Sequence, residues 1–196
     1  TYLEGLKRSS NVAFVKLGYE KLGADKLLEY IKAFGFGNRT GIELPAEEAG
    51  AVTIRKQYAT EVATAAFGQG RLQVTAIQQL AAVAAIANDG KLMKPYLVKS
   101  VTDPQTGSTV HTEPTVVRQV ISAESSRRVG EYLEQVVSDR EIGTGRNAYI
   151  PGYRVAGKTG TAQKVVDGKY AEGKYIVSFI GYAPVEDPRI VLYVVI

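Results

Sequence analysis

The sequence contains no cysteine and a single histidine, His111. Without thiolates, neither a disulfide framework nor a cysteine-based metal site can form, and one imidazole cannot build a histidine metal cluster. His111 stands in the segment STVHTEP, which is typical of a hairpin strand, and we interpret it as a surface residue. We therefore expect neither a bound metal nor a cofactor.

Long apolar runs and long charge runs are also missing. No apolar stretch reaches the roughly 18 residues that a membrane-spanning helix needs. The net charge is +4, but the lysines and arginines are spread along the chain, without the basic stripe interleaved with aromatics that nucleic-acid binding requires. With 196 residues, 45% of them hydrophobic and 22% charged, the chain suits one globular domain or a large piece of one.

Two helices are predicted near the start of the chain. The first runs from Asn11 to Leu22, with Ser9 or Ser10 as its N-terminal cap. Its expected apolar face comprises Val12, Val15 and Leu22. The second is capped by Asp25 and closed by Gly35.

The strongest helical pattern begins at Thr75, where TAIQ forms a capping box and AIQQLAAVAAIAND follows until Gly90. This segment is apolar nearly all round, so we expect it to be buried inside a helical layer. The segment 37–52 before it reads as a loop, and Ser122 is expected to cap a further helix that includes Val136.

Strand patterns dominate the rest of the sequence. The range 96–120 reads as a small hairpin excursion, and after Gly152 the apolar period becomes two. The expected strands cover 153–166, 175–182 and 189–196, with turns at Asp167-Gly168 and at PVEDP. Helices first and an antiparallel sheet afterwards predict an α+β fold.

The segment KTGT, Lys158 to Thr161, carries residues that are poor core material. Alternation along a strand puts the hydroxyls of Thr159 and Thr161 on one face, where both can donate to an anion. Gly157 and Gly160 remove side chains that would keep a ligand away from the strand. The same alternation places Lys158 on the opposite face, and whether its long stem brings the ammonium round is left open. We interpret KTGT as a carboxylate site; the competing interpretation is a glycine-weakened, solvent-facing strand.

A second group of polar residues, SSN at Ser9 to Asn11, stands at a predicted helix start. A hydroxyl and a carboxamide two residues apart can relay a proton and hold an amide. Serine and asparagine are also common helix caps, so SSN alone permits both interpretations.

Together, S-x-N and a K-T-G about 150 residues later resemble the penicillin-binding transpeptidases, which share their fold with the serine β-lactamases. The flanking segments are similar to those of the monofunctional, class B penicillin-binding proteins: SSNVAFVKLG, FGFGNRTGIELP, TAAFGQG, VTAIQQLAAVAAIANDG and PGYRVAGKTGTAQ. The resemblance implies a β-lactamase/transpeptidase-like fold, with a helical layer packed on an antiparallel sheet. Residues 1–196 would be the C-terminal portion of that domain, helical over about 1–150 and with sheet strands over about 152–196.

The resemblance also implies residue roles. Ser9 would relay protons between a catalytic lysine and the leaving amine, and Asn11 would hold the acyl amide. The backbone N–H of Thr161 would form half of the oxyanion hole. The terminal carboxylate of a D-alanyl-D-alanine stem peptide, or of a β-lactam, would be bound by Lys158, Thr159, Gly160 and Thr161.

One element of the family pattern, S-x-x-K, is absent from these residues. No serine has a lysine three positions on, and the two segments with that spacing, 53–56 and 161–164, begin with threonine. The resemblance places the nucleophilic serine and its lysine before Thr1, an anchor helix further upstream, and a C-terminal helix after Ile196. We expect residues 1–196 alone to be inactive, and the intact protein to act on peptidoglycan at the extracytoplasmic face of the cell membrane.

Two other functions are considered. A serine β-lactamase needs a base for deacylation, and Glu43, Glu47 and Glu48 lie in a loop after SSN; however, TGIELPAEEAG resembles the transpeptidase form of that loop, and SSN differs from the usual S-D-N. A β-lactam-sensing or non-catalytic structural module of the same fold would bind without turnover. The sequence does not distinguish roles in division, elongation or sporulation.

Overall fold

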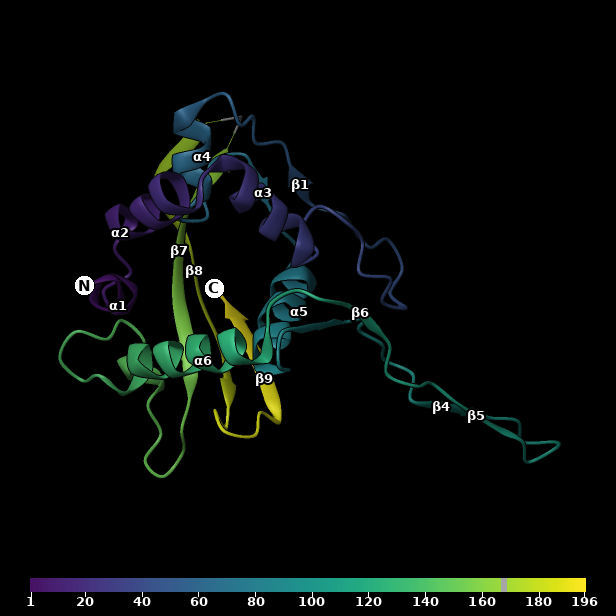
Figure 1. Cartoon of the computed structure of the whole chain (residues 1–196). Helices are drawn as coiled ribbons and strands as arrows, with labels where there is room; N and C mark the ends of the chain where they lie inside the picture. Colours follow the sequence, from purple (N-terminus) through teal and green to yellow (C-terminus); the bar gives the residue numbers. More distant parts are fainter. Residues whose placement is uncertain (167–168) are drawn as a thin grey trace.

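The computed structural model describes residues 1–166 and 169–196, and its α+β architecture confirms the predicted fold class (Figure 1). The helices are α1 (Tyr2–Lys7), α2 (Asn11–Val15), the π-helix η1 (Lys16–Leu22), α3 (Ala24–Ala33), α4 (Ala59–Ala65), α5 (Ala76–Ala87), α6 (Ala123–Ser138) and the 3-10 turn η2 (Arg146–Ala148). The strands are β1 (Ala51–Val52), β2 (Leu72–Gln73), β3 (Lys91–Met93), β4 (Ser100–Thr102), β5 (Thr109–His111), β6 (Val116–Gln119), β7 (Ala156–Val166), β8 (Lys169–Ala183) and β9 (Ile190–Val195).

The main sheet has the order β7-β8-β9, and both strand pairs are antiparallel. Two predicted strand starts are wrong. β7 begins at Ala156 rather than Tyr153, whose amide instead donates to the carbonyl of Ile150 in a turn. β8 begins at Lys169 rather than Tyr175, because pairing with β7 extends the strand through a stretch with weak strand propensity. The predicted turn at Asp167-Gly168 lies outside the described residues.

Helices α5 and α6 pack on this sheet: α6 lies across β7, and α5 contacts β8 and β9 (Figure 1). Buried Tyr182 of β8 reaches α6 at Gly130, where a Cβ would come within 2.5 Å of the tyrosine hydroxyl. The glycine therefore lets helix and strand approach closely, and Ala156, which pairs with Tyr182 in the sheet, is fully buried. This packing fixes where the KTGT strand lies relative to the helices.

The helix predicted over Asn11 to Leu22 is present, but only its first part is α-helical. Ser10 caps α2 by accepting a hydrogen bond from the Ala13 amide, and from Lys16 onward the chain winds as the π-helix η1. The predicted apolar face is wrong in this structure: Val12 is 66% exposed and Leu22 is 41% exposed. The wider π turns rotate Leu22 away from the position that a period of 3.6 gives it, whereas nothing in the structure explains the exposure of Val12 on α2.

The second helix has a different cap from the one predicted. Gly23 is the N-cap residue of α3 and makes no side-chain capping bond, while Asp25 lies in the first turn and pairs with Lys56 at 3.0 Å. Aspartate is favourable both at the N-cap and in the first turn, where it interacts with the helix dipole, so the sequence pattern did not distinguish the two positions. The predicted C-terminal end of the helix at Gly35 is confirmed: Gly35 has a φ of +94°, a backbone conformation that glycine adopts readily.

The predicted capping box of α5 is confirmed, with Thr75 and Gln78 bonding reciprocally. Burial is less complete than its composition suggests, since only Gln78, Ala82 and Ala85 are fully buried, Ala76 is exposed, and the remaining apolar residues are half-buried. Within residues 1–166 and 169–196, no helix combines the length and apolarity needed to cross a membrane. Ser122 caps α6 as predicted.

The predicted hairpin excursion is also present. Strands β4 and β5 pair with each other and extend away from the body of the molecule, as Figure 1 shows. β3 pairs with β6 at the base of this excursion, a pairing that the sequence pattern did not indicate. His111 lies on β5 and is exposed, in agreement with its interpretation as a surface residue.

Gln78 ties the loop 37–50 to α5. It is 1% exposed, and its Nε2 donates to the carbonyls of Asn38 and Ala49, both at 2.7 Å. Its Oε1 accepts from the Thr75 amide at 3.0 Å. A single buried amide therefore satisfies groups from three segments of chain, and each would lose its partner without it.

We expect Gln78→Leu to lower the free energy of unfolding by about 2–4 kcal/mol, because two backbone carbonyls would lose the buried donor they share. Chemical denaturation measures this loss. Gln79→Leu, at the neighbouring half-buried position, is the matched control and should change stability by less than about 0.5 kcal/mol. Equal effects from the two substitutions would contradict the role given to Gln78.

Candidate active site

Ser9 lies in the tight connection between α1 and α2. Its amide donates to the carbonyl of Leu6 at 3.1 Å, and the Ser10 amide donates to that of Gly5 at 2.8 Å. Ser9 has a φ of +54°, in the left-handed region that costs a non-glycine residue of order 1 kcal/mol or more. Ser10 serves as the helix cap, so the hydroxyl of Ser9 is available to the space in front of α2.

Lys158 and Ser9 meet across 149 positions of the sequence. The Nζ of Lys158 donates to the Ser9 hydroxyl at 2.6 Å. It also donates to the carbonyl of Thr159 at 2.9 Å and approaches the Thr159 hydroxyl at 3.4 Å. The Lys158 ammonium therefore lies on the same side of the strand as Thr159. Strict strand alternation had left open whether the long side chain could reach that side.

A cleft of about 560 Å³ contains all six predicted site residues. Ser9 and Asn11 line it from the helical side, and the strand side is formed by Lys158, Thr159, Gly160 and Thr161. Asn11 and Thr161 are exposed within it, so both can contact a ligand. Hydroxyls, a carboxamide and an ammonium converging on one cleft make a site suited to an anionic ligand that also carries an amide.

The two glycines of this strand have a packing role that the sequence did not reveal. A Cβ at Gly157 would collide with the ring of Phe179 on β8, and one at Gly160 would come within 2.6 Å of the Ser178 hydroxyl. Neighbouring side chains of the sheet therefore occupy the space that the glycines leave. Gly160 still lines the cleft, so it serves packing and access together.

Thr144 is a site residue that sequence reasoning missed. It lines the cleft, and its hydroxyl accepts a hydrogen bond from the Thr159 hydroxyl at 3.1 Å. The helical side also contributes Phe14, Ala66, Phe67 and Gln69. The only sequence feature that pointed to Thr144 was the pair of glycines around it, Gly143 and Gly145. Both are buried, which marks a tightly packed turn but does not identify the residues beside it.

Burial lowers the pKa of Lys158 from its ordinary value of 10.5 to about 8, because the charged ammonium is partly withdrawn from water. The desolvation effect outweighs the acceptors around Nζ. Near neutral pH the ammonium is still the main form, yet the neutral amine is accessible at a modest free-energy cost. This is the behaviour expected of a group that binds an anion and exchanges protons.

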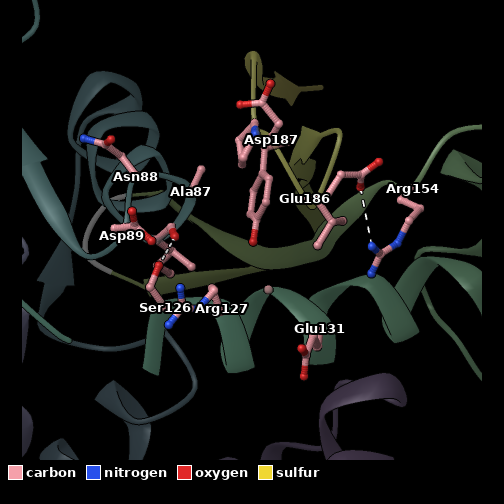
Figure 2. A pocket seen from close by; sticks show the side chains of 14 residues that line it. Ala87, Asn88, Asp89, Ser126, Arg127, Glu131, Arg154, Glu186 and Asp187 are labelled. Carbon is pink, nitrogen blue, oxygen red and sulfur yellow. Dashed lines mark hydrogen bonds and ion pairs between the residues drawn. The ribbon is translucent and has the colours of Figure 1, made fainter. Parts of the chain in front are cut away.

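A second hollow, of about 570 Å³, lies between α6 and the β8–β9 turn (Figure 2). Its lining residues include Ser126, Arg127, Glu131, Arg154, Glu186 and Asp187. Arg154 is held by both carboxylate oxygens of Glu134, at 2.8 and 2.7 Å, and by Glu186 at 3.6 Å. The Arg154 cation in this hollow is therefore already paired with carboxylates. The predicted site residues line the cleft between Ser9 and Lys158 instead.

The whole chain, residues 1–196, matches the family model described as penicillin binding protein transpeptidase domain. It is 52% identical to stage V sporulation protein D of Bacillus subtilis, a match that covers 100% of this chain and 30% of that protein. It is 34% identical to the probable peptidoglycan D,D-transpeptidase PenA of Neisseria meningitidis, over 97% of this chain and 30% of that protein. The chain thus spans about a third of the length of these relatives.

Among solved structures, the fold is similar to penicillin binding protein 3 of Mycobacterium tuberculosis in complex with aztreonam. The TM-score is 0.92 at 34% identity, covering 100% of this chain and 44% of that one. An ampicillin complex of the same protein matches equally well. Both the family resemblance and the β-lactamase/transpeptidase-like fold inferred from the motifs are confirmed.

The charge of Lys158 predicts a pH dependence for binding a carboxylate ligand. Only the protonated form attracts the anion, so the affinity should hold below about pH 7 and fall as the pH rises through about 8. At pH 9 we expect about tenfold weaker binding of a peptide that ends in a free carboxylate, measured by calorimetry on the full-length protein. Lys158→Ala should remove this pH step. An affinity that stays constant up to pH 9.5 would rule out Lys158 as the cation that binds the carboxylate.

Proposed function

The chain belongs to the family of penicillin-binding protein transpeptidase domains, and from that premise we propose that it is the carboxylate-binding portion of a D,D-transpeptidase that cross-links peptidoglycan. The observation that carries the proposal is the 2.6 Å contact between Lys158 Nζ and Ser9 Oγ. It joins the two motifs in one cleft, with Asn11 and the threonines beside them. Residues 1–196 would be the C-terminal portion of the domain, helical over about 1–150 and with sheet strands over about 152–196.

In the proposed reaction, the cleft holds the end of a D-alanyl-D-alanine stem peptide. Lys158 and the Thr161 hydroxyl bind its carboxylate, and the Thr159 hydroxyl, which here donates to Thr144, would turn its proton to the carboxylate as well. Charged hydrogen bonds of this kind contribute roughly 1.5–3 kcal/mol each. Asn11 holds the amide of the acyl group. Gly160 lets the peptide approach the strand, and the Thr161 amide donates to the developing oxyanion.

Ser9 is proposed to carry the proton. Its hydroxyl accepts from Lys158, so its own proton is free to pass to the leaving amine, and the catalytic lysine, which has taken the proton of the nucleophilic serine, would return a proton to Ser9. The seryl nucleophile and its lysine base would come from residues outside these 196, since no serine here has a lysine three positions on. Residues 1–196 alone would therefore be inactive, and the intact protein would act outside the cytoplasmic membrane, held there by an upstream anchor.

Two of the three glutamates considered for a β-lactamase, Glu43 and Glu47, are engaged in other contacts. Glu47 accepts from the Thr40 amide at 2.6 Å and from the Gly41 amide at 2.9 Å, and these bonds, with the Thr40 hydroxyl first, lower its pKa. Glu43 accepts from the Leu97 amide at 2.8 Å. A carboxylate with a lowered pKa is a weak base, so the contacts of Glu47 favour the transpeptidase over the β-lactamase.

We expect benzylpenicillin to acylate the full-length protein, raising its intact mass by one penicillin. Lys158→Ala should lower the acylation rate by about 100-fold or more, because the carboxylate loses its cation and the Ser9 relay loses its partner. Lys164→Ala, on the same strand and exposed, is the matched control and should react like the wild type.

The outcomes separate the three functions. A stable adduct together with cross-linking of stem peptides supports the transpeptidase. An adduct that is hydrolysed rapidly would indicate a β-lactamase, and a stable adduct without any peptide turnover would indicate a sensor. No adduct at all on the full-length protein would contradict the proposal.

A further inference from the structure

We propose that Lys7, Asp139 and Thr144 are positioning residues that set the distance between Ser9 and Lys158. They complete a closed circuit of contacts that starts at Ser9, passes through Lys158, Thr159, Thr144 and Lys7, and returns along two residues of chain to Ser9. We name this circuit, with Asp139 attached to it, the positioning ring. The inference rests on the proposed function, in which the Ser9–Lys158 contact carries the proton relay.

Lys7 is held at two points by the turn that follows α6. Its carbonyl accepts from the Thr144 amide at 3.0 Å, and its Nζ donates to Asp139 Oδ2 at 2.7 Å. The side chains of this ion pair are only 14% and 25% exposed, so water screens it less than an ordinary surface pair. Two bonds of different direction at one residue fix both the position and the rotation of the end of α1.

Asp139 in turn shapes the turn that holds Lys7. Its Oδ1 accepts from the amides of Glu141 and Ile142, both at 3.0 Å, and its carbonyl accepts from the Gly143 amide at 3.0 Å. The Lys7 ammonium, together with these amides, holds the pKa of Asp139 at about 2. The carboxylate therefore stays charged throughout the physiological range, and the pair persists.

The third contact reaches the cleft itself. The Thr159 hydroxyl donates a hydrogen bond to the Thr144 hydroxyl. The oxygen of Thr159 can then accept from Lys158 Nζ, which lies 3.4 Å away. Thr144 thus holds Lys7 with its amide and orients Thr159 with its hydroxyl. Because Ser9 is only two residues beyond Lys7 and adopts a left-handed φ, a displacement of Lys7 would be passed on to the serine hydroxyl.

The test uses the full-length protein and separates the non-covalent affinity for benzylpenicillin from the rate of the acylation step. Lys7→Met keeps the bulk of the side chain and removes its charge. We expect the acylation rate to fall by about tenfold or more, as misplaced reacting groups typically cause, while the non-covalent affinity stays within about threefold. Lys7→Arg should restore the rate to within about threefold of the wild type.

The control is Lys56→Met, which removes an exposed ion pair with Asp25 away from the cleft and should leave both quantities unchanged. Thr144→Ala provides a second variant, which keeps the hydrogen bond from the residue 144 amide to the Lys7 carbonyl and removes only the hydroxyl. We expect the acylation rate alone to fall by about fivefold. Affinity and rate falling together with the melting temperature would indicate a merely structural role and overturn the proposal. An unchanged rate in Lys7→Met would overturn it equally.

Hydrogen exchange tests the ring without relying on activity. In Lys7→Met, the amides around Thr144 and those around Ser9 and Ser10 should all exchange faster, and Lys7→Arg should reverse this. Faster exchange confined to the turn after Asp139 would mean that Ser9 is positioned independently, and the ring would fail. A wild-type protein that benzylpenicillin does not acylate would instead refute the proposed function, while exchange still decides on the ring.

Discussion

The hydrogen bond from Lys158 to Ser9 is the contact on which the site depends. It spans 149 residues and connects the helical part of the chain to the main sheet at 2.6 Å. Everything that places α1 relative to β7 therefore acts on this distance. Two structural supports fix that placement. One is the packing of α6 on the sheet, where Gly130 admits Tyr182 of β8, and the other is the set of bonds that hold Lys7 to the turn after α6.

Function and stability make different demands on the same residues. Partial burial of the Lys158 ammonium is unfavourable, as its lowered pKa indicates, and Ser9 adopts a backbone conformation that a non-glycine residue avoids. Sites of this kind persist because the surrounding structure determines them strongly. Here that structure is the short connection between α1 and α2, whose amides are satisfied by the carbonyls of Gly5 and Leu6.

In the proposed function, ligand binding and proton transfer are carried by different elements of the cleft. The strand β7 presents its lysine, its hydroxyls and a glycine to an extended, anionic ligand, which is the geometry a peptide terminus requires. The helical side presents Ser9 and Asn11, to which the proposed function assigns the amide. Because each side is rigid for its own reason, sheet pairing on one and helix capping on the other, their relative position is the property that the fold has to supply.

The sequence alone determined the features that rest on local rules. The caps at Thr75 and Ser122, the α+β order and the paired motifs at Ser9 and Lys158 could all be read from neighbouring residues, because capping and strand periodicity are short-range effects. Tertiary structure decided the rest. The π-helix after Val15 has no local signature, the longer β8 follows from its partner strand, and the course of the Lys158 ammonium depends on where Ser9 lies. Thr144 and Lys7 belong to the site only because chain folding brings them to it, and such contacts between distant segments leave no pattern in a single sequence.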